Sequence, residues 1–332
     1  MTTDARIGIT STVPAEIIFA AGLVPVDVNN LFIAAPDPAA LVRRAKMDGF
    51  PDTTCSWICG LYGAIMEHGI RRVVGVCGGD CAETQALMEV LAHRGVEVIP
   101  FSYPYERDRE ALRGALANFA ARLGAAMDEA ERVKARLDAV RARVHRLDEL
   151  LWKENRAFGE EVRLVQLQAS DFNGNPDAYT AMVEEKIREV GAREPMTQGL
   201  RMGMLGVPPI VKDLYAQIER EGTRVVFSEV ERQFTLPVPG SIEESYHHYT
   251  YPYGIYARLE DIAREVKARG IDGLVHYVQA FCFRGIEDIV LRAKLSVPVL
   301  TLQGDLPTRM TETMKIRIEA FTDMLVRARG RS

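Results

Sequence analysis

Short apolar runs alternate with amphipathic stretches along most of the chain. Eight runs rich in Val, Ile, Leu and Met predict strands at 5–10, 23–28, 71–77, 96–101, 202–207, 224–230, 274–279 and 297–305. Stretches with helical periodicity lie between them, at 14–22, 39–46, 55–68, 83–92, 211–221, 256–269 and 286–294. This alternation is typical of βαβ units and a parallel sheet. We therefore expect an α/β protein with two tandem, doubly wound parallel-sheet lobes of the Rossmann or flavodoxin type.

A different pattern occupies residues 106–153. Apolar residues recur there every seven positions in two complementary registers, Leu116, Leu123, Ala130, Leu137, Val144 and Leu151 in one and Leu112, Phe119, Ala126, Val133, Val140 and Leu147 in the other. This pattern predicts a long helical arm that packs on another helix, either within the chain or in a dimer. We expect the arm to carry association of the protein. The expected domains are an N-terminal lobe at 1–105, a helical linker or arm at 106–195 and a C-terminal lobe at 196–332.

Composition limits the function classes. The 332 residues include 41 Lys and Arg against 46 Asp and Glu, a net charge of −5, which argues against nucleic acid as a partner. The N-terminal residues lack the pattern of a signal peptide, and no apolar run is long enough to span a membrane. We expect a cytoplasmic protein. The chain lacks G-x-G-x-x-G and G-x-x-x-x-G-K-[ST] patterns, so we expect neither a dinucleotide site nor an intrinsic ATPase.

Candidate chemistry rests on five cysteines, Cys55, Cys59, Cys77, Cys81 and Cys282. An odd number in a reducing compartment disfavours a disulfide framework. Buried cysteine often serves only as a small apolar side chain. Four cysteines within 27 positions, all near predicted loops or helix starts, favour metal binding or catalysis instead.

The cysteines follow predicted strands or open predicted helices. Ligands of parallel sheets bind outside the carboxyl ends of the strands, so thiols from both lobes could meet in one inter-lobe site. Gly78 and Gly79 would let the backbone approach a bulky group there. The helix that starts after Cys81 is expected to lower the pKa of its thiol.

The spacing also bears on the metal. The C-x3-C pairs differ from the C-x2-C knuckles of structural zinc sites, and no histidine lies at ligand spacing from a cysteine. Thiolates from three segments suit an iron-sulfur cluster, and three ligands would leave one iron open to an exogenous ligand. Two alternatives stay open at this point, a non-catalytic electron-transfer partner and a metal-free small-molecule binding protein.

Five stretches in series carry a family resemblance. They are VPAEIIFAAGLVPV (13–26), CSWICGLYGAI (55–65), GDCAETQALMEVL (79–91), DGLVHYVQAFC (272–282), and VPVLTLQGD with KIRIEAF (297–305 and 315–321). In these the chain resembles the 2-hydroxyacyl-CoA dehydratase and benzoyl-CoA reductase superfamily, in particular the D-component of 2-hydroxyglutaryl-CoA dehydratase.

The resemblance implies a [4Fe-4S] cluster held by Cys55, Cys81 and Cys282 between two α/β lobes. It also implies a low-potential electron from a separate ATP-dependent iron-sulfur activator and radical dehydration or reduction of an acyl-CoA or other small molecule. The working unit would be a homodimer or a heterodimer with a related subunit.

The sequence departs from the family at several positions. Thr10 stands where dehydratase subunits often carry a further cysteine, and Cys59 and Cys77 are additional to the three ligands. Some homodimeric members carry a double-cubane cluster, which would need six thiolates where this chain has five.

Other residues are weaker candidates. Glu16, near the start of the first helix, could face the cleft or only complement the helix dipole. Arg232 could bind a carboxylate or phosphate there, or lie exposed at the rim. His247 and His248 belong to a Tyr-rich loop that could line a pocket, while His276 reads as a core histidine.

Overall fold

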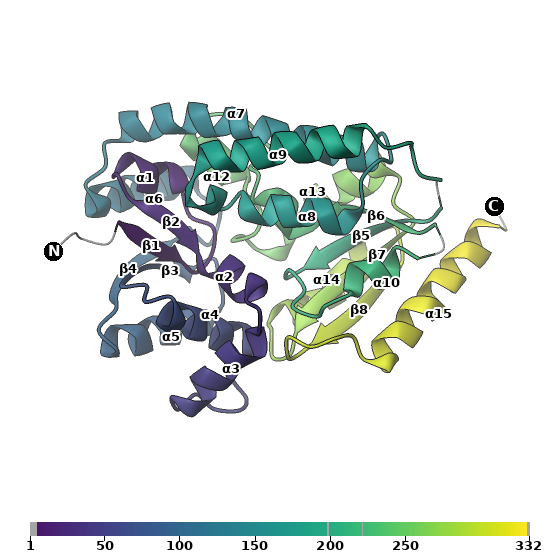
Figure 1. The fold of residues 1–332 in the computed structure, drawn as a ribbon, viewed down its shortest axis with the longest axis horizontal. Helices are drawn as coiled ribbons and strands as arrows, with labels where there is room; N and C mark the ends of the chain where they lie inside the picture. Colours follow the sequence, from purple (N-terminus) through teal and green to yellow (C-terminus); the bar gives the residue numbers. More distant parts are fainter. Residues whose placement is uncertain (1–4, 198, 221, 331–332) are drawn as a thin grey trace.

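The computed structural model describes residues 5–197, 199–220 and 222–330. It contains two four-stranded sheets in which every strand pair is parallel. The strand order is β2-β1-β3-β4 in the first sheet and β6-β5-β7-β8 in the second, which is the same order repeated. Figure 1 shows the two sheets side by side, with the helices arranged around them. The prediction of two tandem α/β lobes is confirmed.

The first lobe is built from the N-terminal part of the chain. Its strands are β1 (Arg6–Ile9), β2 (Val24–Asp27), β3 (Arg72–Gly78) and β4 (Glu97–Ser102), and its helices are α1 (Ala15–Ala20), α2 (Val28–Ala34), α3 (Pro38–Met47), α4 (Ser56–Glu67) and α5 (Ala82–His93). Adjacent residues of a strand point to opposite faces. Val73 therefore packs in one core cluster with α4 and α5, while Val74 packs in another with α1 and α6.

Four helices follow the first lobe. They are α6 (Arg109–Leu123), α7 (Met127–Trp152), α8 (Gly159–Gln168) and α9 (Pro176–Gly191), with the short helix η1 (Phe172–Gly174) before α9. In Figure 1, α7 and α9 lie along the top of the molecule and extend over both sheets.

The heptad pattern of residues 106–153 does not form one arm. Gly124 adopts a left-handed conformation (φ 72°) that ends α6, so the seam is divided between two helices. Leu116 packs in the core of the first lobe, and Leu137 and Val144 pack against residues of α8 and α9. Most of the seam is thus buried inside the chain, although Ala126 is exposed. This leaves no continuous apolar face for the expected association through the seam.

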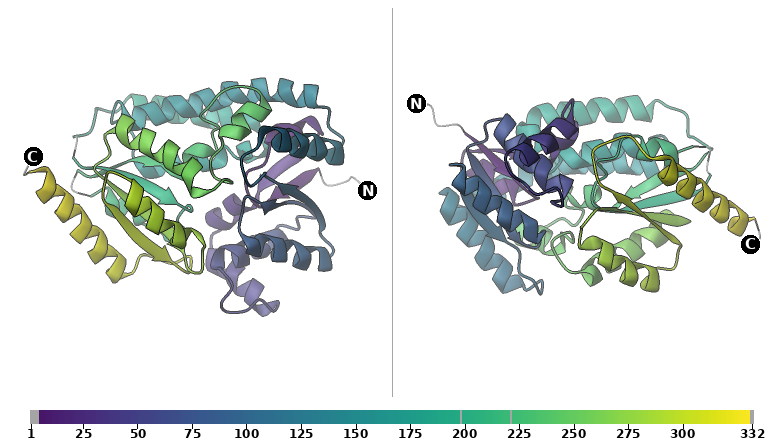
Figure 2. Two further views of the ribbon diagram at one scale, coloured as in Figure 1. Left: turned by 180° about the vertical axis from the view of Figure 1, so that it is seen from behind. Right: turned by 90° about the horizontal axis from the view of Figure 1, so that it is seen from below.

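The second lobe begins after these helices. Its strands are β5 (Arg201–Gly206), β6 (Arg224–Ser228), β7 (Gly273–Gln279) and β8 (Val299–Gly304), and its helices are α10 (Leu214–Ile218), α11 (Glu229–Gln233), α12 (Ile242–His248), α13 (Ile255–Arg269), α14 (Arg284–Lys294) and α15 (Glu312–Arg329). One face of the sheet packs on α10 and α15, and the other on α13 and α14. Figure 2 shows α15 at the outer edge of this lobe.

One segment of the second half, residues 236–253, crosses to the first lobe. Tyr246, Tyr249 and Tyr253 pack in the core cluster that contains the residues of β1 and β3. On the surface, Arg113 pairs with Glu243 at 2.8 Å. This segment fastens the two lobes to each other.

None of the helices in the described ranges combines the length and apolar character that a bilayer crossing requires.

Candidate functional site

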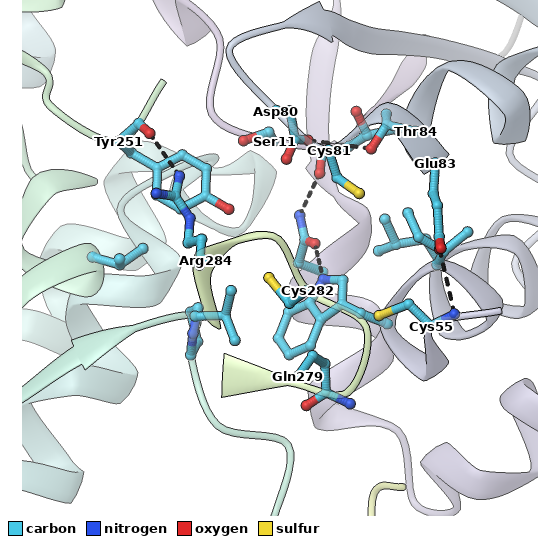
Figure 3. Close-up of a pocket in the computed structure, with 18 of the residues that line it drawn as sticks. Ser11, Cys55, Asp80, Cys81, Glu83, Thr84, Tyr251, Gln279, Cys282 and Arg284 are labelled. Carbon is cyan, nitrogen blue, oxygen red and sulfur yellow. Dashed lines mark hydrogen bonds between the residues drawn. The ribbon is translucent and has the colours of Figure 1, made fainter. Parts of the chain in front are cut away.

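A pocket lies between the lobes at the carboxyl ends of their strands (Figure 3). Its wall includes Thr10 and Asp80, which follow β1 and β3, and Val207, which follows β5. In both sheets the strand order reverses beside β1 or β5, the place where ligands of open α/β sheets bind. The cavity volume of the pocket is about 90 Å³. The two lobes therefore form one shared site.

Three cysteines from three separate segments line this pocket. Cys55 is the N-cap residue of α4, Cys81 is the N-cap residue of α5, and Cys282 lies one residue before the N-cap of α14. Figure 3 shows their sulfur atoms around a common space. Each thiol thus stands at the start of a helix, where unpaired backbone N–H groups favour negative charge.

Burial nevertheless dominates the ionisation of these thiols. It raises the pKa of Cys55 to about 12 and that of Cys81 to about 11, and it raises the pKa of Cys282 as well. The backbone N–H groups of the helix starts lower these pKa values by a smaller amount. The expectation of a lowered pKa at Cys81 is therefore wrong for the metal-free protein, because loss of water outweighs the helix N-terminus.

The donor set suits a cluster better than a single ion. No three His, Cys, Asp or Glu side chains within the described ranges gather closely enough to hold one metal ion. A mononuclear site needs all its donors around one centre. In an iron-sulfur cluster each thiolate binds a different iron, so the donors can stand farther apart. Three thiols around one inter-lobe space fit such a group.

Sequence comparison identifies the family. The profile of the 2-hydroxyglutaryl-CoA dehydratase D-component matches residues 10–325. The chain belongs to this dehydratase family. A comparison with curated proteins gives no significant match. The matched range includes every strand of the two sheets except β1 (Arg6–Ile9), so membership in the dehydratase family covers most of both lobes and the pocket between them.

Two further cysteines do not line the pocket. Cys59 is fully buried in the core cluster between α4 and its neighbours, with its thiol 4.0 Å from the carbonyl oxygen of Thr54. The Cys77 thiol contacts the sulfur of Met88 at 3.6 Å. Only three of the five thiols therefore share the pocket.

Gly78 and Gly79, which precede Cys81, pack closely against other residues of the protein. Gly79 has φ +89°, and a Cβ built there would lie 2.6 Å from Cβ of Pro252, which belongs to the crossing segment 236–253. A Cβ at Gly78 would lie 3.1 Å from Cβ of Ser102. Neither glycine is part of the pocket wall. Close packing of the chain accounts for both glycines without a cofactor.

The two weak catalytic candidates lie away from the pocket wall. Glu16 is fully buried, pairs with Arg141 at 2.7 Å and accepts a hydrogen bond from the Tyr246 hydroxyl at 3.0 Å. Arg232 is buried and pairs with Asp261, so it is neither an exposed rim residue nor directed at a ligand. Both charges are satisfied inside the protein, and neither supports a catalytic role.

None of the three candidate histidines lines the pocket. His248 pairs with Glu244 at 3.0 Å, and the His247 carbonyl accepts a hydrogen bond from Arg107 at 2.8 Å. His276 is buried in β7 and bonded to Asp288 at 3.0 Å, as expected of a core histidine. From the Tyr-rich loop, it is Tyr251 that lines the pocket.

Several pocket residues were missed by the sequence reasoning. Glu83 accepts a hydrogen bond from the backbone N–H of Cys55 at 3.3 Å and so joins two cysteine segments. Asp80 is a second acidic group, and burial raises its pKa to about 6. Arg284 donates to the carbonyl of Tyr251 at 2.8 Å. All three lie within three residues of Cys81 or Cys282, and that proximity was the available signal.

Proposed function

We propose that this chain is the cluster-binding subunit of an enzyme of the 2-hydroxyacyl-CoA dehydratase and benzoyl-CoA reductase type. In this proposal Cys55, Cys81 and Cys282 hold a [4Fe-4S] cluster. The observation that carries it is the meeting of these three thiols in one pocket while Cys59 and Cys77 lie outside it. Family membership supports the dehydratase type of chemistry.

The residues of the chain have distinct roles in this proposal. The N–H groups at the starts of α4, α5 and α14 stabilise thiolate charge. Glu83 fixes the Cys55 segment to α5 through its bond to the backbone N–H of Cys55. Arg284 places a positive charge beside Cys282. The cluster, when bound, supplies a low-potential electron and an iron open to an exogenous ligand.

The proposal includes partners. An ATP-dependent iron-sulfur activator would deliver the electron, and a second copy or a related subunit would complete the working unit. The reaction would be radical dehydration or reduction of an acyl-CoA or another small molecule.

The test is anaerobic reconstitution with iron and sulfide, followed by iron quantitation and absorption spectroscopy. Cys55→Ser, Cys81→Ser and Cys282→Ser should each remove more than about half of the bound iron, because a hydroxyl is a poor iron ligand in place of thiolate. Cys59→Ser and Cys77→Ser are matched controls and should keep it. Equal losses in all five variants would contradict the three-ligand assignment, and an iron-free wild type would contradict the cluster altogether.

The same experiment addresses a double cubane. Such a cluster would need six thiolates, and three thiols face the pocket within the described part of the chain. Iron and sulfide near four of each per chain are the expected result. About eight of each would favour the double cubane instead.

A further inference from the structure

The charges around the pocket bear on what it can hold. Among the described residues of its wall, Asp27, Asp80 and Glu83 carry carboxyl groups, and Arg284 is the one lysine, arginine or histidine. Three thiolates would outweigh the positive charge of the iron-sulfide core that they hold, so the bound group would be anionic as well. A ligand that brings a free carboxylate into this space would need a cation to balance its charge, since an unpaired buried charge is costly.

Arg284 is already engaged by the protein. Its guanidinium donates to Glu287 at 3.2 Å and to the carbonyl of Tyr251 at 2.8 Å. It also lies 4.5 Å from the centroid of the Tyr251 ring. The Glu287 carboxylate, which also pairs with Arg258, offsets part of its charge, and the ring covers one side of it. A ligand carboxylate would have to compete with both contacts.

The rest of the wall combines apolar side chains with uncharged polar ones, and both kinds come from both halves of the chain. Its aliphatic and aromatic side chains include Ile33, Ile58, Leu61, Leu167, Val230 and Phe234. These apolar side chains gain free energy by covering methyl, methylene or aryl groups. The uncharged polar side chains of the wall, such as Asn29 and Gln279, bring no positive charge to balance a carboxylate. The apolar surface and the charges of the wall therefore both favour a ligand with an uncharged apolar side chain.

From these observations we infer that the acyl group handled in this pocket has an uncharged apolar side chain and no free carboxylate. The inference rests on the proposed function, because it takes an acyl thioester as the substrate. It concerns the side chain of that substrate. The family is described by a 2-hydroxyglutaryl thioester, which has a free carboxylate, but family membership does not decide the side chain for this protein.

The test uses two saturated thioesters, 5-methylhexanoyl-CoA and glutaryl-CoA. They differ at the end of the acyl chain, where an isopropyl group replaces a carboxylate of similar shape, and neither has a 2-hydroxyl group to eliminate. Binding to the cluster-loaded full chain is measured by anaerobic calorimetry. We expect 5-methylhexanoyl-CoA to bind at least about tenfold more tightly. Equal or tighter binding of glutaryl-CoA overturns the inference.

A matched pair of variants tests whether charge is the discriminator. Ile33 is half-buried and also lines two neighbouring cavities, so a long side chain there has room to extend. Ile33→Arg should narrow or reverse the preference, while Ile33→Met, which adds length without charge, should keep it. An unchanged preference in Ile33→Arg counts against the inference.

Iron quantitation on the same samples separates the two possible failures. A protein without iron contradicts the proposed cluster. A protein that holds iron and binds neither thioester contradicts the thioester substrate, and the inference falls with it. A cluster-loaded protein that prefers glutaryl-CoA contradicts the inference alone.

Discussion

Two buried aspartates beside the pocket show how strongly burial controls single residues in this protein. Asp27 accepts hydrogen bonds from the Ser170 hydroxyl and the Asn29 backbone, and its own N–H donates to Asp171 at 2.6 Å. No ion pair to either carboxyl is found among the described residues. Burial, and to a smaller extent the nearby Asp27 carboxylate, raise the pKa of Asp171 to about 7. Asp171 is therefore protonated in the folded protein at mildly acidic pH.

A raised pKa makes stability depend on pH. The contribution of Asp171 to the free energy of unfolding is complete below its ordinary pKa of 3.8 and is lost as pH rises through about 7. We expect the wild type to lose on the order of 2 kcal/mol between pH 5 and 8 through this group. Asp171→Asn should flatten that dependence in urea unfolding, while Asp323→Asn, at an exposed position, should leave it unchanged. An equal slope in wild type and Asp171→Asn would show that the carboxyl is ionised throughout.

At the scale of elements, the heptad seam shows that a sequence pattern can predict which face of a helix is buried but cannot identify what covers that face. The spacing of Leu112 to Leu151 correctly indicated apolar helix faces. The partners are the first lobe for α6 and the helices α8 and α9 for α7. A second chain is not needed to cover these faces.

The seam therefore serves stability. Leu137 is fully buried in the cluster formed by α7, α8 and α9. Leu137→Ala should lower the free energy of unfolding by about 2–4 kcal/mol through the cavity it leaves, with no change of apparent size in gel filtration. Arg136→Ala, at the exposed neighbouring position, is the control and should change stability by less than about 0.5 kcal/mol. Dissociation of an oligomer at unchanged stability would instead support an arm between subunits.

At the scale of the whole molecule, the crossing segment 236–253 connects the two lobes. Its Pro252 lies against Gly79, two residues before Cys81, and its Tyr251 lines the pocket. The position of one cysteine segment therefore depends on chain that is distant in sequence. Packing between the lobes and the geometry of the pocket are coupled.

A comparison of two glycines distinguishes the effect of the Pro252 contact from the effect of backbone strain alone. Gly79 and Gly95 both have positive φ, +89° and +83°, but a Cβ at Gly95 would meet nothing within 4 Å. Ala at either position costs about 1 kcal/mol from backbone strain. Gly79→Ala should cost about 1–3 kcal/mol more because of the collision with Pro252, and it should also reduce iron retention after reconstitution. Equal stability and iron content in the two variants would mean that Pro252 moves aside freely.

The sequence by itself determined the class of fold. Alternating strand and helix periodicity gave the eight strands and the two lobes, since a chain of parallel strands needs a crossover between each pair. The sequence also placed Cys55, Cys81 and Cys282 at strand ends or helix starts. Those local features depend on neighbours within a few residues, so they can be read directly from the order of amino acids.

Only the tertiary structure decided which groups meet. The spacing of the five cysteines left their neighbours open, and only the family resemblance set three of them apart. In the structure, the backbone sends Cys59 into the core and leaves Cys77 against Met88. The same holds for Glu16, whose partner Arg141 is 125 positions away (141 − 16). Contacts of this kind depend on how lobes and helices dock, because long-range packing and burial set both the position and the ionisation of each side chain.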